Sequence, residues 1–143
     1  MIKIVALRAA HITAIQLQQA QSGTAAHMDS VQARALVDAD GVGWAAEDEQ
    51  GRVIACAGIV EMHRQRGLAW AMFSDTALSR FKIIHRVATR VLAASPWRRV
   101  EMHVDCNHAA GCRWAERLGF VSEGVMKAVT PDGRDCFLYA RVG

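Results

Sequence analysis

The sequence predicts an α/β fold with a central mixed β-sheet and helices on both of its faces. Helical and strand-type apolar spacings alternate along the whole chain, three strand-like segments follow one another in a meander, and a long helix then leads into another strand. Hairpins pair strands antiparallel, whereas a strand–helix–strand crossover pairs them parallel, so the sheet is expected to be mixed. The 143 residues are 52% hydrophobic and contain no linker-like segment, which predicts a single domain over residues 1–143.

The N-terminal part predicts one strand followed by two helices. Lys3–Leu7 is a short apolar strand, and the apolar spacing of His11–Gln21 is compatible with a helix. Gly23 and Thr24 are expected to break this helix, and a second helix then ends by Gly41.

The next three segments predict an antiparallel meander. Val42–Glu47 and Arg52–Met62 are rich in Val, Ile and Ala and are separated by the turn-forming residues 48–51, so they are expected to form a hairpin. Leu68–Ser74 carries apolar side chains on both faces, which predicts a strand in the centre of the sheet.

The second half predicts a helix, a strand, a helix closed by Gly119, and a final hairpin. These elements are expected over Arg80–Ala94, Arg99–Asp105, Ala109–Leu118, Phe120–Val129 and Asp135–Val142. Because the first of these helices is long enough for a crossover, the strands Leu68–Ser74 and Arg99–Asp105 are expected to run parallel. They are also expected to diverge toward their C-terminal ends.

Composition and charge exclude several classes of function. A net charge of +3 without a long Lys/Arg run favours a small anionic ligand and predicts no nucleic-acid partner. No signal peptide and no apolar run of about 18 to 20 residues is present, so a cytoplasmic protein without membrane contact is expected. The four cysteines form no C-x-x-C pair, and the side chains of His103, Asp105 and Cys106 do not all share one strand face, so no metal site is predicted.

The segment Trp114–Phe120 resembles the closing half of the GCN5-related N-acetyltransferases (GNAT), in which a helix ends at a Leu-Gly-Phe step and leads into a strand. The following Glu123-Gly124 and the hairpin turn Pro131–Asp135 fit the same pattern, as does the element order over nearly all of the chain. The amino-acid sequence of this half also resembles that of divergent GNAT-like proteins of tailed phages. This resemblance would place the protein in the cytoplasm of a bacterial host.

The resemblance implies acetyl-CoA or another acyl-CoA as a substrate, with an amine of a small molecule or a protein as the acceptor. It implies cofactor-binding residues at the end of the central strand, in the first turn of the main helix and at the start of the last helix. These are Met72, Phe73, Ser74, Arg80, Lys82, Asn107 and His108. Asn107 or His108 would bind the pantetheine, although Asn107 could instead be an ordinary helix N-cap.

The phosphate-binding region departs from the family pattern. Family members usually have a glycine-rich loop here, but this chain has no glycine between Gly67 and Gly111. Arg80 and Lys82 are therefore expected to bind the diphosphate through side-chain charge. The alternative is that both are solvated residues on a helix that starts earlier, at Asp75 or Thr76.

The catalytic pattern also departs from the family. Many members have a tyrosine four residues before the glycine of Leu-Gly-Phe as the acid that protonates the thiolate, and Ala115 occupies this position. The only tyrosine, Tyr139, is expected to be a core or interface residue. The resemblance places Glu61, His103 and His63 near sheet positions that face the acceptor cleft in the family. Glu61 and His103 are therefore the predicted catalytic residues, as bases for the acceptor amine, and His63 is a further candidate.

Three functions remain open from the sequence. The first is an acyl-CoA-dependent N-acyltransferase that uses the cofactor-binding and catalytic residues named above. The second is a catalytically impaired GNAT-fold phage virion or accessory protein, and the third is a protein that binds another small ligand in the same cleft. A homodimer is possible through the terminal hairpin, Val121–Val142.

Overall fold

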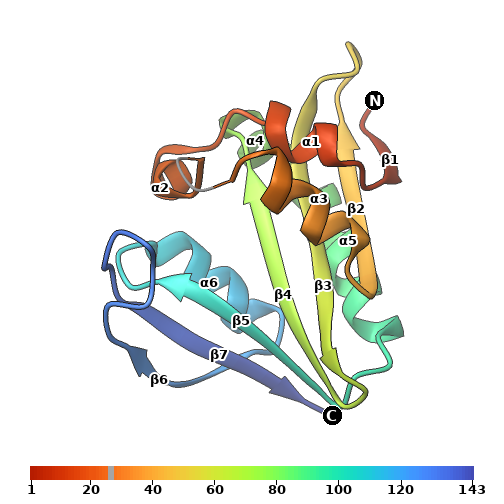
Figure 1. Cartoon of the computed structure of the whole chain (residues 1–143). Helices are drawn as coiled ribbons and strands as arrows, with labels where there is room; N and C mark the ends of the chain where they lie inside the picture. The colour runs from red at the N-terminus through yellow and green to blue at the C-terminus, as the bar shows by residue number, and fades with distance from the viewer. Residues whose placement is uncertain (26–27) are drawn as a thin grey trace. The chain divides into compact units, whose positions relative to one another are not determined.

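The computed structural model describes residues 1–25 and 28–143 and contains the helices and strands labelled in Figure 1. In chain order they are β1 (Lys3–Ala6), α1 (Ala9–Ala14), the short 3-10 helix η1 (Gln19–Gln21), α2 (Ser22–Ala25), α3 (Ser30–Asp38), β2 (Gly41–Glu47), β3 (Val53–His63), β4 (Arg66–Phe73), α4 (Asp75–Ser79), α5 (Phe81–Ala94), β5 (Arg99–Asp105), α6 (Ala109–Arg117), β6 (Val121–Met126) and β7 (Cys136–Val142). None of the described helices is both long and apolar enough to cross a membrane.

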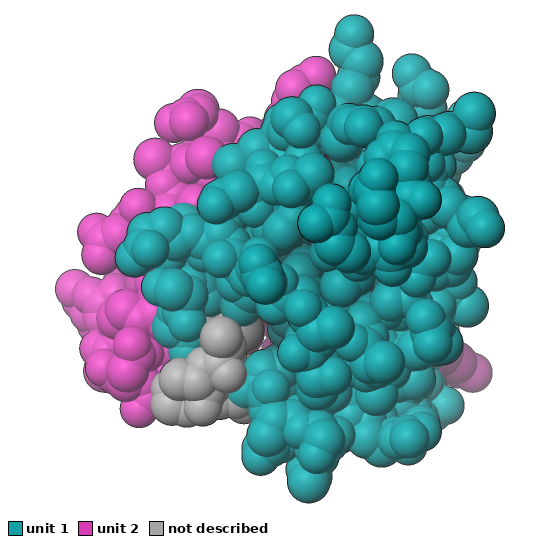
Figure 2. Space-filling view, turned by 90° about the horizontal axis from the view of Figure 1, so that it is seen from above, with its two compact units in different colours: residues 1–60, 71–95 teal, residues 61–70, 96–143 magenta. Residues whose placement is uncertain are grey.

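The chain forms two compact units, coloured teal and magenta in Figure 2. Unit 1 consists of Met1–Val60 and Ala71–Ser95, and unit 2 consists of Glu61–Trp70 and Pro96–Gly143. The expectation of a single domain over 1–143 stays a prediction.

The strands form one mixed sheet in the order β1-β2-β3-β4-β5-β7-β6, which confirms the predicted fold class. β2 and β3 pair antiparallel, with Trp44 opposite Ala57, as the hairpin prediction required. β4 is the fourth of the seven strands, so its predicted central position is also confirmed.

β4 and β5 run parallel, as predicted, with their pairing inside unit 2. The register extends from Arg66 opposite Arg99 to Ala69 opposite Met102. The predicted divergence of the two strand ends involves residues of both units, and it stays a prediction.

The predicted helix over His11–Gln21 is wrong. α1 ends at Ala14, because Ile15 takes an extended backbone conformation and is buried. The backbone N–H of Gln18 then donates to the carbonyl of Phe73 on β4 (2.8 Å) instead of to a helical carbonyl. A tertiary contact here overrides local helix propensity. Gly23 and Thr24, expected to break a helix, lie within α2.

The core of unit 1 combines small sheet residues with the apolar face of a helix. β2 and β3 bury Ala45, Ala55 and other small side chains, which lets helices approach the strands closely. In unit 1, α1 and α3 lie on one face of the strands and α5 lies on the other (Figure 1). α5 buries Ile84, Ala88 and Leu92, which are four residues apart and therefore share one helix face.

In unit 2, α6 ends in the capping motif that Gly119 predicts. Gly119 has a positive φ of 96°, and its N–H donates to Glu116 O while the N–H of Phe120 donates to Ala115 O (both 3.0 Å). This crossed pair of bonds is the Schellman motif, in which a left-handed glycine follows the helix at little steric cost. Phe120 is buried, and β6 starts at the next residue, Val121, one residue later than predicted.

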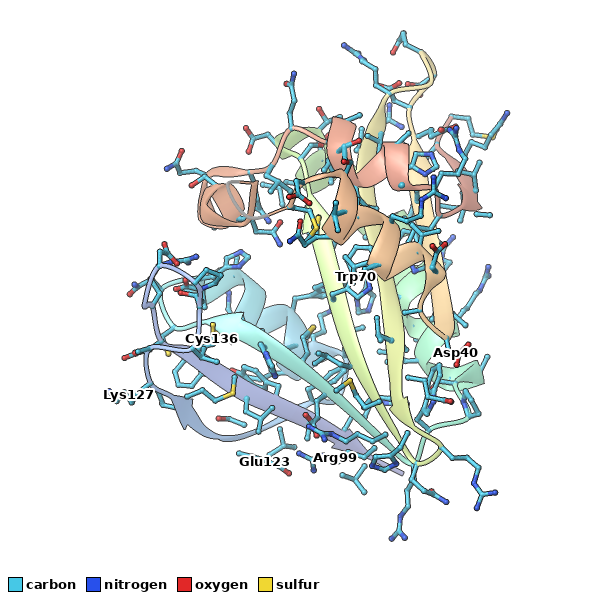
Figure 3. The ribbon with its side chains drawn as sticks, viewed as in Figure 1. Asp40, Trp70, Arg99, Glu123, Lys127 and Cys136 are labelled. Carbon is cyan, nitrogen blue, oxygen red and sulfur yellow. The ribbon has the colours of Figure 1, made fainter. Side chains whose placement is uncertain are left out.

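Unit 2 also contains a chain of ion pairs across the first residues of β4, β5 and β6. The buried carboxylate of Glu101 accepts from Arg66 (Nε 2.6 Å, Nη2 2.8 Å) and from Arg99 Nε (2.6 Å). Arg99 continues to Glu123, and Figure 3 shows these two side chains beside each other. The four charges balance, so the network presents no net charge to a ligand, and we expect it to fix the register of the strands.

Candidate functional site

The predicted cofactor-binding residues of unit 1 lie at the end of β4 and around α4 and α5. Met72, Phe73 and Ser74 are all buried. Ser74 faces β3, because its backbone N–H and its hydroxyl both donate to Ile54 O (2.9 and 3.0 Å). Since backbone groups of alternate strand residues point to opposite edges, those of Ala71 and Phe73 point away from β3.

The edge of β4 that faces away from β3 is already hydrogen-bonded within unit 1. The side-chain amide of Gln21 donates to Ala71 O (2.7 Å) and accepts from the N–H of Phe73 (2.9 Å). Phe73 O accepts from the N–H of Gln18. The Gln21 amide thus bonds to β4 as a peptide group of a neighbouring strand would. An extended amide-containing ligand that used this edge would have to replace these bonds.

A short helix stands where a glycine-rich loop is usual. Ser74 is the N-cap of α4, and Arg80 both ends α4 and precedes the first residue of α5, Phe81. The alternative prediction is a main helix that starts earlier, at Asp75 or Thr76. Helical structure does begin at Asp75, but it forms the separate short helix α4 and not the first turn of α5. The backbone conformation of Arg80 (φ −116°, ψ 22°) separates the two helices.

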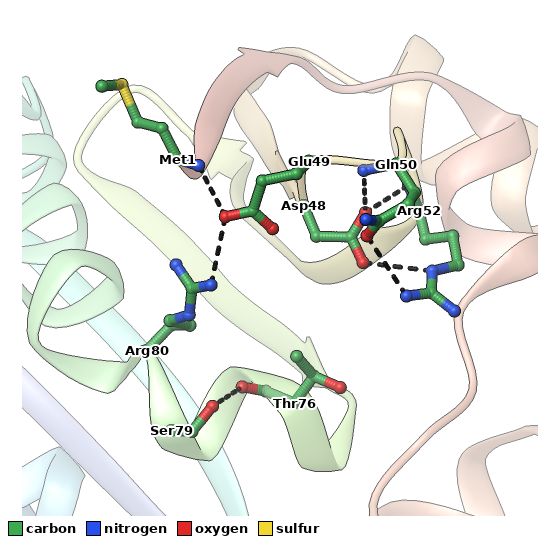
Figure 4. Close-up of polar contacts among 8 residues, drawn as sticks. All are labelled: Met1, Asp48, Glu49, Gln50, Arg52, Thr76, Ser79 and Arg80. Atoms are coloured by element: carbon green, nitrogen blue, oxygen red, sulfur yellow. Dashed lines mark hydrogen bonds and ion pairs between the residues drawn. The ribbon is translucent and has the colours of Figure 1, made fainter.

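The charge of Arg80 is partly neutralised by an ion pair. Arg80 Nη2 lies 3.1 Å from Glu49 Oε1, which also lies 2.5 Å from the amino group of Met1 (Figure 4). Hydrogen bonds from that amino group, from the Glu49 backbone and from Arg80 lower the pKa of Glu49 to about 2. Lys82 is exposed and has no ion pair within the described residues. An anion bound here would compete with Glu49 for Arg80.

The two predicted catalytic residues lie in unit 2, and no hydrogen bond or ion pair joins them within the described residues. Glu61, near the end of β3, accepts a hydrogen bond from Trp97 Nε1 (2.7 Å). His103 is exposed on β5, and partial desolvation lowers its pKa below the ordinary value, with a smaller opposing effect of Glu101. A neutral imidazole is the form that can accept a proton from an amine. The further candidate His63 is exposed, and its Nδ1 accepts from the N–H of Gln65.

The turn between β5 and α6 places His108, and not Asn107, at the N-cap of α6. The interpretation of Asn107 as an N-cap is therefore wrong. Its N–H donates to Asp105 Oδ1 (2.8 Å), and the other carboxylate oxygen of Asp105 accepts from Arg134. Both carboxylate oxygens of Asp105 therefore already accept hydrogen bonds from groups of the protein. Within the described residues, no group of three His, Cys, Asp or Glu side chains could hold a metal ion.

Ala115 and Tyr139 have the environments of core residues. Ala115 is fully buried in α6, and Tyr139 on β7 is buried with its hydroxyl donating to Glu116 Oε2 (2.9 Å). Tyr139 also packs edge-to-face on Phe137, with ring centroids 6.1 Å apart. Burial and the Glu116 carboxylate raise the pKa of Tyr139, which makes it a weaker acid. The expectation that Tyr139 belongs to the core is confirmed.

Sequence reasoning missed Gln18, Gln21 and Glu49 as residues that contact the predicted cofactor-binding positions. The only sequence signal for the first two was the concentration of glutamine within residues 16–21. Glu49 lies in a turn whose sequence gives no indication of its contact with Arg80.

Solved structures of acetyltransferases are similar to this chain over nearly its whole length. A candidate phosphinothricin N-acetyltransferase is 12% identical, with 99% of this chain and 98% of that chain covered and a TM-score of 0.75. A GNAT-family acetyltransferase from Streptococcus pneumoniae is 15% identical, with both chains fully covered and a TM-score of 0.70. A variant of the spermidine N-acetyltransferase SpeG from Vibrio cholerae is 14% identical, with 99% and 93% covered and a TM-score of 0.68.

No protein-family model matches the sequence, and no curated protein matches it. At identities of 12 to 15%, the similarity concerns the fold. The parallel pairing of β4 with β5 and the seven-stranded order agree with that comparison. The chain therefore has the fold of the GNAT-family acetyltransferases.

Proposed function

We propose that this chain is an N-acyltransferase of the GNAT superfamily that uses acetyl-CoA or another acyl-CoA as donor and an amine as acceptor. The observation that carries the proposal is the full-length similarity to structures of acetyltransferases. Fold alone does not determine activity, so the proposal also depends on the chemistry that the chain can supply.

The required chemistry is modest. A neutral amine attacks the thioester carbonyl directly, so the protein must orient the two substrates and accept a proton with a weak base. His103, with its lowered pKa, is a base that stays neutral near pH 7, and Glu61 is the second candidate. The amine acceptor is a small molecule or a protein side chain. Spermidine is a suitable first acceptor to test because SpeG, a spermidine N-acetyltransferase, has a similar fold.

The test measures the release of the CoA thiol from acetyl-CoA in the presence of a panel of amines that includes spermidine, together with the thermal shift caused by acetyl-CoA and CoA. A ligand that binds the folded state raises the melting temperature by mass action. Turnover that disappears in His103→Gln or Glu61→Gln would assign the base. Absence of both turnover and a thermal shift at millimolar acetyl-CoA would contradict the proposal.

The alternative of a non-catalytic phage protein receives no support from the matched structures named above, which are acetyltransferases. Binding of another small ligand would be favoured only if a ligand other than an acyl-CoA produced the thermal shift.

Replacing both Arg80 and Lys82 with Gln is expected to weaken CoA binding by about 1 kcal/mol. The full value for two charge-assisted contacts would be about 1 to 3 kcal/mol, but Arg80 already pairs with Glu49. Glu49→Gln should have the opposite effect and strengthen CoA binding, because it releases Arg80. Calorimetric titration at two salt concentrations measures both effects, and high salt should reduce them.

The results for the two variants test different parts of the prediction that Arg80 and Lys82 bind CoA. Equal CoA affinity in the wild type and the Arg80/Lys82 double variant would remove both residues from the binding site. Unchanged affinity in Glu49→Gln would show that the ion pair does not compete with CoA.

A further inference from the structure

The imidazole of His108 lies directly over Gly111 in the first turn of α6. A Cβ atom at position 111 would lie 2.6 Å from His108 Nδ1 and 2.9 Å from its Cε1, distances that real Cβ atoms essentially never show. Only glycine leaves room for the ring in this place. Glycine within a helix destabilises it by about 1 kcal/mol relative to alanine, so the position of the ring depends on a locally unfavourable residue.

The His108 ring is half-buried and has no hydrogen-bond partner anywhere in residues 1–25 or 28–143. His108 is the N-cap residue of α6, but its side chain accepts no hydrogen bond from the first N–H groups of the helix. Among the described residues, the charge of Asp105 favours the protonated ring, and Asp105 is itself bonded to Arg134. Desolvation outweighs Asp105 and lowers the pKa of His108, so the ring is neutral near pH 7. Within the part of the chain that the structure describes, no hydrogen bond therefore occupies either ring nitrogen.

The same helix face carries Ala115, two turns after His108. Helical side chains lean toward the N-terminus, so a long side chain at position 115 would extend over Gly111 and Cys112. The His108 ring lies against the same Gly111. It thus occupies the helix surface that the acid of many GNAT enzymes would reach from position 115, where this chain has a fully buried alanine.

We propose that His108 carries the proton in the acyl transfer, from the attacking amine to the departing thiolate. This inference rests on the proposed function. The amine nitrogen forms the new C–N bond to the thioester carbonyl, and the neutral imidazole of His108, in place of His103 or Glu61, accepts the N–H proton. As the C–S bond breaks, the sulfur keeps the electron pair and receives that proton from the imidazolium. The products are the amide and CoA with a free thiol, and His108 returns to its neutral form.

The test uses His108→Ala, Gly111→Ala and the double variant, with CoA-thiol release from acetyl-CoA and the amine panel as the assay. His108→Ala should lower kcat by about 100-fold, the lower end of what general acid–base catalysis contributes. Added imidazole should restore part of the rate, because it fills the space left by the ring. Gly111→Ala should lower kcat by about tenfold while the melting temperature stays equal or rises, since alanine favours the helix. In the His108→Ala background, Gly111→Ala should leave kcat unchanged.

These outcomes separate a proton carrier from a structural histidine. Wild-type turnover that persists in His108→Ala would overturn the role of His108 and leave the proposed function standing. The same conclusion would follow if imidazole gave no rescue, or if Tyr139→Phe abolished the rate while His108→Ala did not. A wild type that releases no CoA with any amine would overturn the proposed function and this inference together.

Discussion

Glu101→Gln is expected to lower the free energy of unfolding by about 3 kcal/mol at neutral pH, the usual loss when one partner of a buried ion pair is removed. Glu101 is 4% exposed, and its carboxylate accepts three hydrogen bonds from the guanidinium groups of Arg66 and Arg99. The amide of glutamine cannot accept on both sides, so two neighbouring cations would lose their shared counter-charge. Strands β4 and β5, which meet at these residues, would lose the interaction that fixes their register.

The same carboxylate makes the folded state sensitive to acid. Hydrogen bonds from Arg66, and then from Arg99, lower the pKa of Glu101 from 4.5 to about 2. A group with a depressed pKa in the folded state contributes its full stability above the pKa of the unfolded state. This contribution is lost as the pH falls from about 4.5 toward 2.

Urea unfolding at several pH values between 7 and 2.5 measures both effects. The wild type should lose more stability between pH 4.5 and 2.5 than Glu101→Gln, which has no carboxylate to protonate at this position. Glu123→Gln is the matched control, because Glu123 is exposed and binds the same Arg99, and it should cost at most about 1 kcal/mol. A loss in Glu101→Gln no larger than in this control would show that the network contributes little.

The sequence predicted the sheet and most of its elements because their signals are local. The hairpin of β2 and β3 and the strand β5 follow from residue type and turn composition, and Gly119 ends α6 through a backbone conformation that glycine adopts at low cost. The parallel pairing of β4 with β5 follows from the length of the crossover helix. Such features depend on residues close in sequence, so they can be derived before a structure is known.

The errors occur where distant segments meet. The predicted helix over His11–Gln21 ends early because Gln18 and Gln21 bond to β4, about fifty residues away in the chain. The sequence predicts either an anion or solvent as the partner of Arg80, because nothing near Arg80 in the sequence reveals Glu49. Glu61 and His103 are predicted from residue type and from sheet positions that face the acceptor cleft in the family that the sequence resembles, and their catalytic roles stay predictions. Position 111 illustrates the same limit, since the sequence alone does not show what lies against a helical glycine.

Gln21→Ala is expected to increase the affinity for CoA about tenfold, or 1.4 kcal/mol, if an extended pantetheine chain uses the edge of β4 that faces away from β3. In the free protein the Gln21 amide occupies Ala71 O and Phe73 N–H, and a ligand must break both bonds before it forms its own. Each such bond contributes about 0.5 to 1.5 kcal/mol net, so relief from both is consistent with a tenfold effect. The variant should also unfold more easily, by about 1 kcal/mol, because the free protein loses the same bonds.

Calorimetric titration of CoA into the wild type, Gln21→Ala and Gln19→Ala measures the change. Gln19 is the matched control, because it lies in the same short helix and is exposed, and its side chain forms no hydrogen bond within the described residues. Gln19→Ala should bind CoA as the wild type does. Equal affinity in all three proteins would show that CoA does not use this edge of β4. A weaker affinity in Gln21→Ala alone would instead identify Gln21 as a direct contact of the ligand, with its amide turning from the strand to the pantetheine.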